Sequence, residues 1–524
     1  MGPKTRSKFI YTVEIFWLLL LLMYVSMAYV GYPKLSSSFF NADWVTFSRF
    51  FDDFFLEHGH YKDWILFPAP HFFPDMLVFF PFFFLIKDIY FQFLIVMELM
   101  IILHYLSVRI IYSQFFTKQA TIFALAATSS LFLLAVKGKL PFILALLPAV
   151  HVGEVVTGLF LLGIHFFLIE YNKLDYKSYC LCAISAVIAF ASGLSDLLFI
   201  IQFAVPIFLT YSFLVIFKKI KPRLGFIFSL PVIVGANLGG FLAKFVVSKN
   251  ILLDYLDYPS LSKISIKTIV IQWFAFIQLI KSLNNYKIEV VLALFYFLIS
   301  TLLIVSFFNK FKKKSKIHID KKIVFLCVFI LTSIVINIIS VFFFGDATYR
   351  VAERYFITFY YVPFLLFFLP FSCFKDYFFV NKMMLGLSFL VFLYFVTSMY
   401  SLTHKSEFKL HMNYYPKEIR CIDKLLKRHG QYGISQYWDA NVVTSLSREH
   451  LQLVPLKPDL TPFYWSINVR KFENPISFII LDEGSPWSLP KGKVYKKYGI
   501  PRKEVICYSK RVLIYPKNSI KIVS

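Results

Sequence analysis

Residues suited to acid–base chemistry are concentrated in one segment near the start of an otherwise apolar chain. Segment 32–75 holds six carboxylates and three basic residues, the reverse of the balance in the whole chain, which has 55 Lys and Arg and 30 Asp and Glu. The carboxylates are Asp43, Asp52, Asp53, Glu57, Asp63 and Asp75. A carboxylate beside an acceptor hydroxyl can take up its proton, so this segment is a candidate site for a general base.

Asp43 has two open interpretations. It begins a stretch, residues 43–55, in which aromatic and aliphatic side chains recur at helical spacing, as in an amphipathic helix of the membrane interface. A carboxylate at the start of a helix can cap it, and capping is as good an explanation as catalysis. The neighbouring Asp52, Asp53 and Glu57 are expected on the solvated face of the same helix.

Further rare polar residues are expected on the same side of the membrane as this segment. They are His71, His151, Glu154 and Asp196, followed by Asp346, Arg350, Glu353 and Arg354 in one short connection. Ionisable residues at membrane depth are costly and are therefore functional candidates, although a salt bridge or a snorkelling arginine explains any single one. Together, a carboxylate-rich loop and a pair of arginines suit an anionic phosphate ligand and a proton-accepting base.

The composition excludes a single soluble domain. Of the 524 residues, 58% are hydrophobic and 16% are charged, whereas globular chains are roughly half apolar and about a quarter charged. The formal net charge of +25 is typical of a membrane protein whose basic residues lie in cytoplasmic loops and at lipid headgroups. We therefore predict membrane lipids as partners and exclude nucleic acid.

Long apolar runs predict a polytopic α-helical membrane protein of about eleven to thirteen spans, because one span needs about 20 apolar residues. The runs are 10–30, 74–87, 89–112, 119–136, 140–170, 178–194, 197–217, 224–247, 289–308, 322–345, 355–372 and 383–401, and segments 140–150 and 268–281 are ambiguous. Basic clusters at 218–223 and 310–316 belong in the cytoplasm by the positive-inside rule. The N-terminus is then cytoplasmic and loop 32–75 extracytoplasmic. The Phe, Ile and Lys bias is compatible with a bacterial inner membrane.

A second domain, residues 402–524, is expected after the transmembrane domain, residues 1–401. Its composition is mixed polar, and alternating runs at 477–481 and 511–515 predict strands beside a helix at 417–429. The sequence therefore predicts a small extracytoplasmic α/β or α+β domain.

Two features of this second domain have open interpretations. Cys421 and Cys507 can form a disulfide in an oxidising compartment, or they can be two buried thiols. The stretch 432–441 and Trp465 are rich in aromatic and amide groups, which bind carbohydrate rings by stacking and directed hydrogen bonds but also serve as core and turn residues.

The order of these features resembles the GT-C superfamily of integral membrane glycosyltransferases, which includes protein O-mannosyltransferases, oligosaccharyltransferases and the lipid A aminoarabinose transferase. The resemblance rests on a long outward loop after the first span, its early acidic residue Asp43 and its Pro-rich end at 68–75. It implies transfer of a sugar, with inversion, from a polyprenyl-phosphate donor to a glycan, lipid or protein acceptor on the extracytoplasmic face.

The resemblance also implies roles for individual residues. Asp43 would deprotonate or orient the acceptor hydroxyl, with Asp75 as the second catalytic candidate, and Arg350 and Arg354 would hold the donor phosphate. Further candidates are His71, His151, Glu154, Asp196 and Glu353. The loop contains no Asp-x-Asp or Glu-x-Asp metal motif, so no metal ligand and no cofactor besides the lipid-linked donor are predicted.

Two other functions stay open at this point. An envelope polysaccharide polymerase fits the same extracytoplasmic chemistry, although its main loop is expected late in the chain. A transporter or flippase for lipid-linked sugars is expected to show internal repeats and polar residues at the midplane of several spans.

Overall fold

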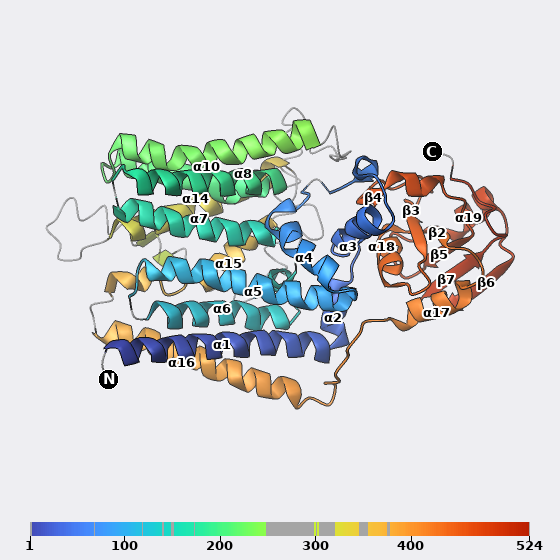
Figure 1. Cartoon of the computed structure of the whole chain (residues 1–524), viewed down its shortest axis with the longest axis horizontal. Helices are drawn as coiled ribbons and strands as arrows, with labels where there is room; N and C mark the ends of the chain where they lie inside the picture. The colour runs from blue at the N-terminus through green and yellow to red at the C-terminus, as the bar shows by residue number, and fades with distance from the viewer. Residues whose placement is uncertain are drawn as a thin grey trace.

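Apolar runs of this length satisfy their backbone polar groups by forming helices, and the structure follows that rule. A computed structural model describes residues 3–522 except 68, 118, 139–140, 148–150, 172, 248–297, 300, 303–319, 345–354 and 375–377. Long helices lie side by side in a helical domain, and an α/β domain sits at one end of it (Figure 1). We call that end the junction end and the opposite one, where the N-terminus lies, the far end.

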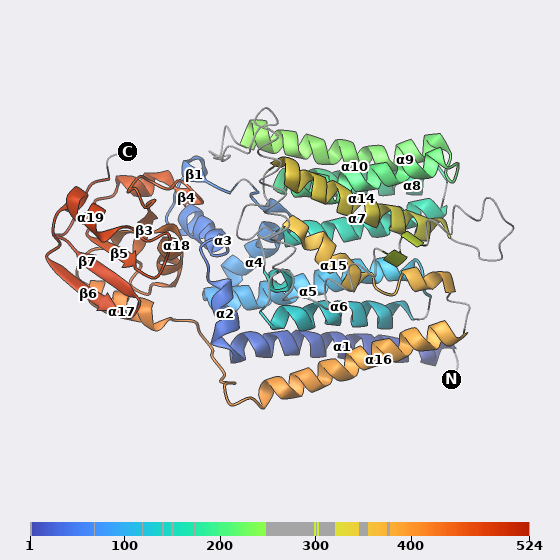
Figure 2. The same cartoon turned by 180° about the vertical axis from the view of Figure 1, so that it is seen from behind.

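Ten α-helices of the helical domain, apart from those of the first loop, have both ends within the described part of the chain. They are α1 (Pro3–Gly31), α5 (Ile89–Ser113), α6 (Ala120–Val136), α7 (Val152–Tyr171), α8 (Tyr176–Ser195), α9 (Val205–Ile216), α10 (Pro222–Leu242), α14 (Lys321–Phe344), α15 (Ile357–Leu365) and α16 (Phe378–Thr403). The α14 and α15 helices cover α7 and α6 from behind (Figure 2).

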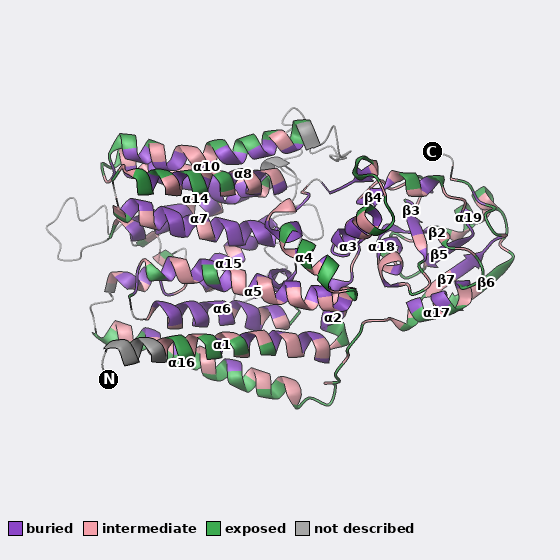
Figure 3. Ribbon diagram, viewed as in Figure 1, coloured by how far each residue is buried: buried purple, intermediate pink, exposed green. Residues whose placement is uncertain are grey.

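Burial differs sharply between the helices (Figure 3). In the most apolar 18-residue stretch of α7, 89% of the residues are buried inside the protein, whereas in that of α16 only 17% are buried. Apolar side chains such as Phe379 and Phe389 of α16 therefore face outward, as expected for contact with lipid tails. Seven helices of the described chain are long and apolar enough to cross a membrane. The chain is a helical membrane protein with α7 at its centre.

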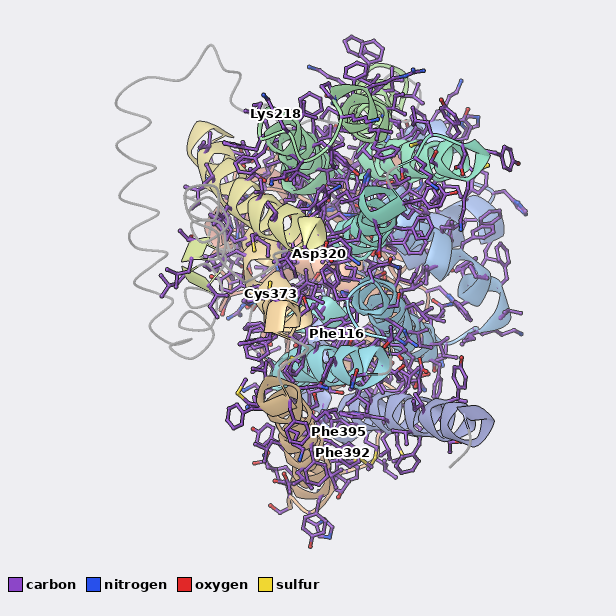
Figure 4. All side chains as sticks on the ribbon, turned by 90° about the vertical axis from the view of Figure 1, so that its left-hand side faces the viewer. Phe116, Lys218, Asp320, Cys373, Phe392 and Phe395 are labelled. Atoms are coloured by element: carbon purple, nitrogen blue, oxygen red, sulfur yellow. A yellow bond between two sulfur atoms is a disulfide. The ribbon has the colours of Figure 1, made fainter. Side chains whose placement is uncertain are left out.

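The far end of the helical domain carries the basic cluster that the sequence places in the cytoplasm. Figure 4 shows this end from outside, with Lys218 and Asp320 on it. The Lys322 ammonium donates to the carbonyl oxygen of Gln114 and to Glu170, each at 2.5 Å, which joins the far ends of α14, α5 and α7. The cluster at 218–223 and the α/β domain thus lie at opposite ends of the helices, as the sequence predicts.

The expected span at 74–87 is wrong. Residues Phe72–Leu85 form a π-helical turn followed by α4 (Leu77–Leu85), and at 1.5 Å per residue this helix is about 21 Å long, short of the roughly 30 Å of a hydrocarbon core. The α5 helix then starts beside the end of α1, where the Tyr29 hydroxyl donates to the Tyr90 carbonyl oxygen at 3.0 Å. The segment between α1 and α5 therefore begins and ends at the junction end, and α4 does not cross to the far end.

Other predicted spans differ from the observed helices in detail. The run at 197–217 contains a π-helical turn, Ile200–Ala204, before α9, and the ambiguous segment 140–150 includes a short 3-10 helix, Phe142–Leu146. Segment 268–281 and nearly all of run 289–308 lie outside the described residues. The total of eleven to thirteen spans stays a prediction.

The α/β domain contains a mixed five-stranded sheet in the order β3-β2-β5-β7-β6. Strand β2 is parallel to β3 and β5, whereas β7 is antiparallel to β5 and β6. The elements are α17 (Lys417–Leu426), β2 (Tyr432–Ser435), α18 (Tyr437–Leu446), β3 (Gln452–Pro455), β4 (Ile467–Asn468), β5 (Phe478–Asp482), α19 (Lys491–Tyr498), β6 (Lys503–Cys507) and β7 (Lys510–Ile514). Strands β5 and β7 lie within one residue of the stretches expected at 477–481 and 511–515, and the helix expected at 417–429 ends earlier, at Leu426.

Of the two interpretations of Cys421 and Cys507, the structure has the disulfide. It joins α17 to the end of β6 across a sequence separation of 86 residues. Cys180, Cys182, Cys327 and Cys373 form no disulfide. A link over a loop of that length removes much of the conformational freedom of the unfolded domain.

Removing this disulfide is expected to destabilise the α/β domain by about 4–5 kcal/mol, from the loop-closure entropy of the unfolded chain. The Cys421→Ser variant tests this in thermal unfolding of the full chain in detergent, with Cys373→Ser as the control that should unfold like the wild type. Mass spectrometry after alkylation in denaturant should find four reactive thiols, and six after reduction. Six thiols before reduction would contradict the link.

Candidate functional site

The first loop, residues 32–88, is docked on the α/β domain. Its short strand β1 (Trp64–Ile65) pairs antiparallel with β4, so that Trp64 lies opposite Asn468 and Ile65 opposite Ile467. Besides β1 and α4, the loop contains α2 (Pro33–Phe39) and α3 (Thr46–Phe51). The α3 helix contacts α18 of the α/β domain. The loop carboxylates therefore lie at the boundary between the two domains.

Asp53 is the most firmly held of these carboxylates. Its side chain is buried, and its Oδ2 accepts hydrogen bonds from Trp64 Nε1 at 2.6 Å and from Asn468 Nδ2 at 2.8 Å. The ammonium of Lys471 lies 3.1 Å from Oδ1. Burial by itself raises the pKa of Asp53, but Lys471 and the two donors outweigh burial and lower it. Asp53 is an ionised structural link between the loop and the α/β domain.

The expected solvated face is thus only partly correct. Glu57 is exposed, as predicted, and pairs with Lys471 at 3.1 Å. Asp53 is buried instead, because docking covers that face of the helix. Asp52 is half-buried, and burial, followed by the nearby charge of Glu57, raises its pKa to about 6 against the opposing effect of two cations.

A buried arginine lies in the same boundary. The guanidinium of Arg49 is 3% exposed and donates through Nη1 to Asn441 Oδ1. The Asn441 amide in turn donates to the Ala42 carbonyl oxygen at 3.3 Å. Among the described residues Arg49 Nε and Nη2 have no hydrogen-bond partner. Burial lowers the pKa of Arg49 to about 10, which leaves it positively charged at neutral pH.

Asp43 does not cap the helix. The side chain of Asn41 accepts the backbone N–H groups of Asp43 and Trp44 and so closes the turn before α3. Asp43 is partly exposed, and its Oδ1 accepts a hydrogen bond of 2.6 Å from the Tyr437 hydroxyl at the start of α18. Burial and the negative charge of Asp43 raise the pKa of Tyr437 well above its usual value, so Tyr437 remains a neutral donor.

His71, His151 and Asp196 form a second group of functional candidates, buried at the junction end. Asp196 Oδ2 is hydrogen-bonded to His151 Nδ1 and lies 3.8 Å from His71 Nδ1, and the two imidazole centres are 5.4 Å apart. Although burial raises the pKa of Asp196, the two imidazoles lower it to about 2, so the carboxylate is ionised at neutral pH. We call these three residues the His/Asp cluster. One potential metal ligand atom of each residue lies within 4.8 Å of the others.

The local backbone holds the cluster in place. His71 precedes α4 with φ 52° and His151 precedes α7 with φ 61°, both in the left-handed region that non-glycine residues rarely adopt. The His71 N–H donates to the Ser195 carbonyl oxygen at 3.2 Å, and the Phe73 N–H donates to Ser195 Oγ at 2.8 Å. Strained residues of this kind concentrate at functional sites, where the surrounding structure imposes the conformation.

Two further predicted residues flank the cluster. Asp75 is 1% exposed, and its carboxylate packs so closely on the first turn of α7 that a Cβ on Gly153 would lie 2.3 Å from Asp75 Oδ2. Glu154 is 3% exposed, and its electrostatic neighbours include Asp196 and Asp75. Five of the predicted residues thus converge.

Aromatic contacts run from the cluster to the α/β domain. The Phe67 ring centre lies 6.3 Å from that of His71 and 6.3 Å from that of Trp465. Trp465 is stacked with Phe463, whose ring is 5.3 Å from Tyr437, the partner of Asp43. Asp43 and the His/Asp cluster therefore border one aromatic region.

Some predicted residues are not placed in this site. Arg350, Glu353 and Arg354 lie outside the described residues. The sequence interpretation also missed Arg49 and Lys471, because nothing in a single sequence indicates that residue 471 lies against the loop. The only sequence signal for Arg49 is that it is a basic residue within the carboxylate-rich segment. Lys471 lies opposite that segment only in the folded protein.

Other buried or recessed features lie away from the cluster. His104 in α5 bonds to the Met100 carbonyl oxygen at 2.7 Å, and His165 in α7 bonds to the Tyr211 hydroxyl at 3.0 Å. A cleft of about 780 Å³ lies between the junction ends of α1, α6 and α16. Its lining includes Tyr24, Tyr32, Lys34, Lys137, Tyr394 and Lys405.

Comparison of the chain with protein-family models, with curated proteins and with solved structures gives no match.

Gly153→Ala is expected to destabilise the protein by about 1–3 kcal/mol, because the new methyl group overlaps Asp75 and Pro74 and forces them to move. Gly386→Ala is the matched control, since no described atom lies within 4 Å of the Cβ it would add. Both variants are compared with the wild type by thermal unfolding in detergent. Equal midpoints for the two variants would refute the close approach of Asp75 to α7.

Asp52→Asn is expected to stabilise the protein in a pH-dependent way. The pKa of Asp52 is about 6 in the folded protein and about 3.9 in an unfolded chain. Ionisation of Asp52 therefore destabilises the folded state as the pH rises above about 4, and this destabilisation is complete above about pH 6. The gain should be on the order of 1–2 kcal/mol at pH 7.5 and smallest at pH 4. Thermal unfolding across this range measures it, with the exposed Glu473→Gln as control. A gain independent of pH would contradict the raised pKa.

Proposed function

We propose that this protein is a membrane glycosyltransferase that moves a sugar from a polyprenyl-phosphate donor to an acceptor at the junction end. The observation that carries the proposal is the position of Asp43, a partly exposed carboxylate beside an aromatic surface of the α/β domain. Sugar transfer needs a base for the acceptor hydroxyl and flat apolar faces for the sugar ring. Both requirements are met at the domain boundary.

The aromatic surface suits a carbohydrate. Phe463 and Trp465 are partly exposed, and Trp438, whose ring lies 5.1 Å from Tyr437, is 38% exposed. Aromatic faces stack on the C–H groups of sugar rings, while neighbouring amide and hydroxyl groups supply directed hydrogen bonds. We assign this surface to the acceptor, next to the base that activates it.

The proposed reaction is a displacement at the anomeric carbon. Asp43 takes the proton of the acceptor hydroxyl, the acceptor oxygen bonds to the anomeric carbon, and the bond from that carbon to the phosphate oxygen breaks. The hydrogen bond from Tyr437 fixes the orientation of the carboxylate. The leaving group is polyprenyl phosphate, and its charge is assigned, as in the sequence prediction, to Arg350 and Arg354.

The membrane arrangement that goes with this function is also part of the proposal. With the basic far end in the cytoplasm, the junction end and the α/β domain are extracytoplasmic, and a disulfide between Cys421 and Cys507 is expected in such a compartment. We propose a bacterial inner membrane and eleven to thirteen spans.

The cleft between α1, α6 and α16 supports contact with anionic lipids. Lys34, Lys137 and Lys405 line it at the junction ends of these helices, against a single carboxylate, Glu407, and three tyrosines also line it. Ammonium groups at that level attract lipid phosphates, and tyrosine rings suit the membrane interface.

The two alternative functions remain distinguishable from this one. A transporter needs polar groups at mid-depth, whereas in the described chain His71, His151 and Asp196 gather at the junction end. A polymerase shares the chemistry of the site but differs in its product, a lengthened chain.

Asp43→Asn is expected to reduce sugar transfer at least 100-fold, because the amide keeps the hydrogen bond to Tyr437 but cannot accept the proton. Mass spectrometry of envelope glycans and polyprenyl-linked sugars compares a deletion strain complemented with wild type, Asp43→Asn or Glu57→Gln at equal protein level. The exposed Glu57→Gln should restore the wild-type pattern.

Three results separate the candidate functions. Loss of one sugar with accumulation of its lipid-linked donor supports the transferase. Loss of chain length with single units retained supports the polymerase, and a donor trapped on the cytoplasmic face supports the transporter. Full complementation by Asp43→Asn would make Asp43 a structural link only.

A further inference from the structure

We propose that His71, His151 and Asp196 bind a divalent transition-metal ion, with Zn²⁺ as the preferred ion. The proposal does not depend on the proposed sugar transfer. Two imidazole nitrogens and one carboxylate oxygen form a donor set that suits zinc, whereas magnesium and calcium prefer oxygen ligands alone. The three side chains come from three separate places in the chain and meet only in the folded protein.

The distances within the cluster lie on either side of those in a zinc site. Zinc bonds of about 2.0–2.1 Å in tetrahedral geometry hold the donor atoms about 3.3 Å apart. His71 Nδ1 and Asp196 Oδ2 are 3.8 Å apart, whereas His151 Nδ1 is within hydrogen-bond distance of the same oxygen. An ion fits when His151 moves away from Asp196 and His71 moves toward it, so that coordination replaces the hydrogen bond between His151 and Asp196.

The charge around the cluster favours a cation. Asp75, Glu154 and Asp196 are three buried carboxyl groups, and Asp75 and Asp196 are electrostatic neighbours of Glu154. Three buried carboxyl groups this close together disfavour one another's ionisation unless a positive charge compensates it. A divalent ion beside Asp196 supplies that charge.

The ligands are held in position before any ion binds. The second oxygen of Asp196 accepts the Leu198 N–H at 2.9 Å, which directs the first oxygen toward the histidines. The Ser195 carbonyl fixes the backbone of His71, and His151 lies between His71 and Tyr355, whose ring centre is 5.6 Å away. Metal sites depend on such supporting contacts to orient their ligands. Three protein ligands leave one coordination position for water or a substrate oxygen.

The test is metal binding by the purified full chain in detergent. The protein is stripped with a chelator and titrated with Zn²⁺ in a calorimeter, and with Co²⁺ followed by its visible absorption. We expect one equivalent of metal per chain and a higher thermal midpoint with Zn²⁺. Failure of the stripped wild type to bind either ion overturns the proposal.

Matched variants identify the ligands. His71→Asn, His151→Asn and Asp196→Asn should each weaken Zn²⁺ binding at least 10-fold. His58→Asn is the control, because His58 also has a positive φ, 57°, but is exposed on the same loop. Asparagine tolerates that backbone conformation, so the two loop variants keep similar backbone strain. Unchanged affinity in all three cluster variants overturns the proposal.

X-ray absorption of the zinc-loaded wild type gives an answer even if the variants misfold. We expect scattering from two imidazoles and light oxygen ligands. A sulfur shell would assign the zinc to cysteines such as Cys180 or Cys182 and overturn the proposal. Metal binding without sugar transfer would contradict the proposed function alone, and sugar transfer by a protein that binds no metal would contradict this inference alone.

Discussion

The buried carboxylate of Asp53 is the interaction on which the arrangement of the two domains depends. It accepts hydrogen bonds from Trp64 of the loop and from Asn468 of the α/β domain, and it pairs with Lys471 of the α/β domain. Ionised carboxylates are costly to bury unless several donors and a cation compensate them, and here all of these are present. The pairing of β1 with β4 adds backbone hydrogen bonds to the same contact. The loop is therefore held in a fixed position against the α/β domain.

Fixing the loop has consequences for both groups of candidate residues. It sets Asp43 against Tyr437, and it sets the end of the loop, with His71 and Asp75, against the first turn of α7 and the turn after α8. The central position of α7 matters for the same reason. A helix buried on nearly every side offers a rigid frame, so His151 at its start can be held in a strained backbone conformation.

The site also shows how an apolar membrane protein accommodates polar groups. In the described chain most buried carboxylates lie at the junction end, where Asp53 meets two donors and Lys471, and Asp196 meets two imidazoles. Isolated histidines inside the helices, His104 and His165, are satisfied by single local hydrogen bonds. Charge is thus concentrated where the protein can compensate it, which is the condition for a reactive centre in a low-dielectric medium.

The sequence by itself determined the helical membrane character, the strands at 477–481 and 511–515 and the candidates His71, His151 and Asp196, because hydropathy, alternation and rare polar residues are local signals. It could not determine that run 74–87 does not cross the membrane. That conclusion needs the contact between Tyr29 and Tyr90, which shows that α5 starts beside the end of α1. Tertiary structure alone decided that Asp53 is buried, that Asp43 meets Tyr437, and that three ligands from separate segments share one point. These contacts join residues tens to hundreds of positions apart, and no local pattern records them.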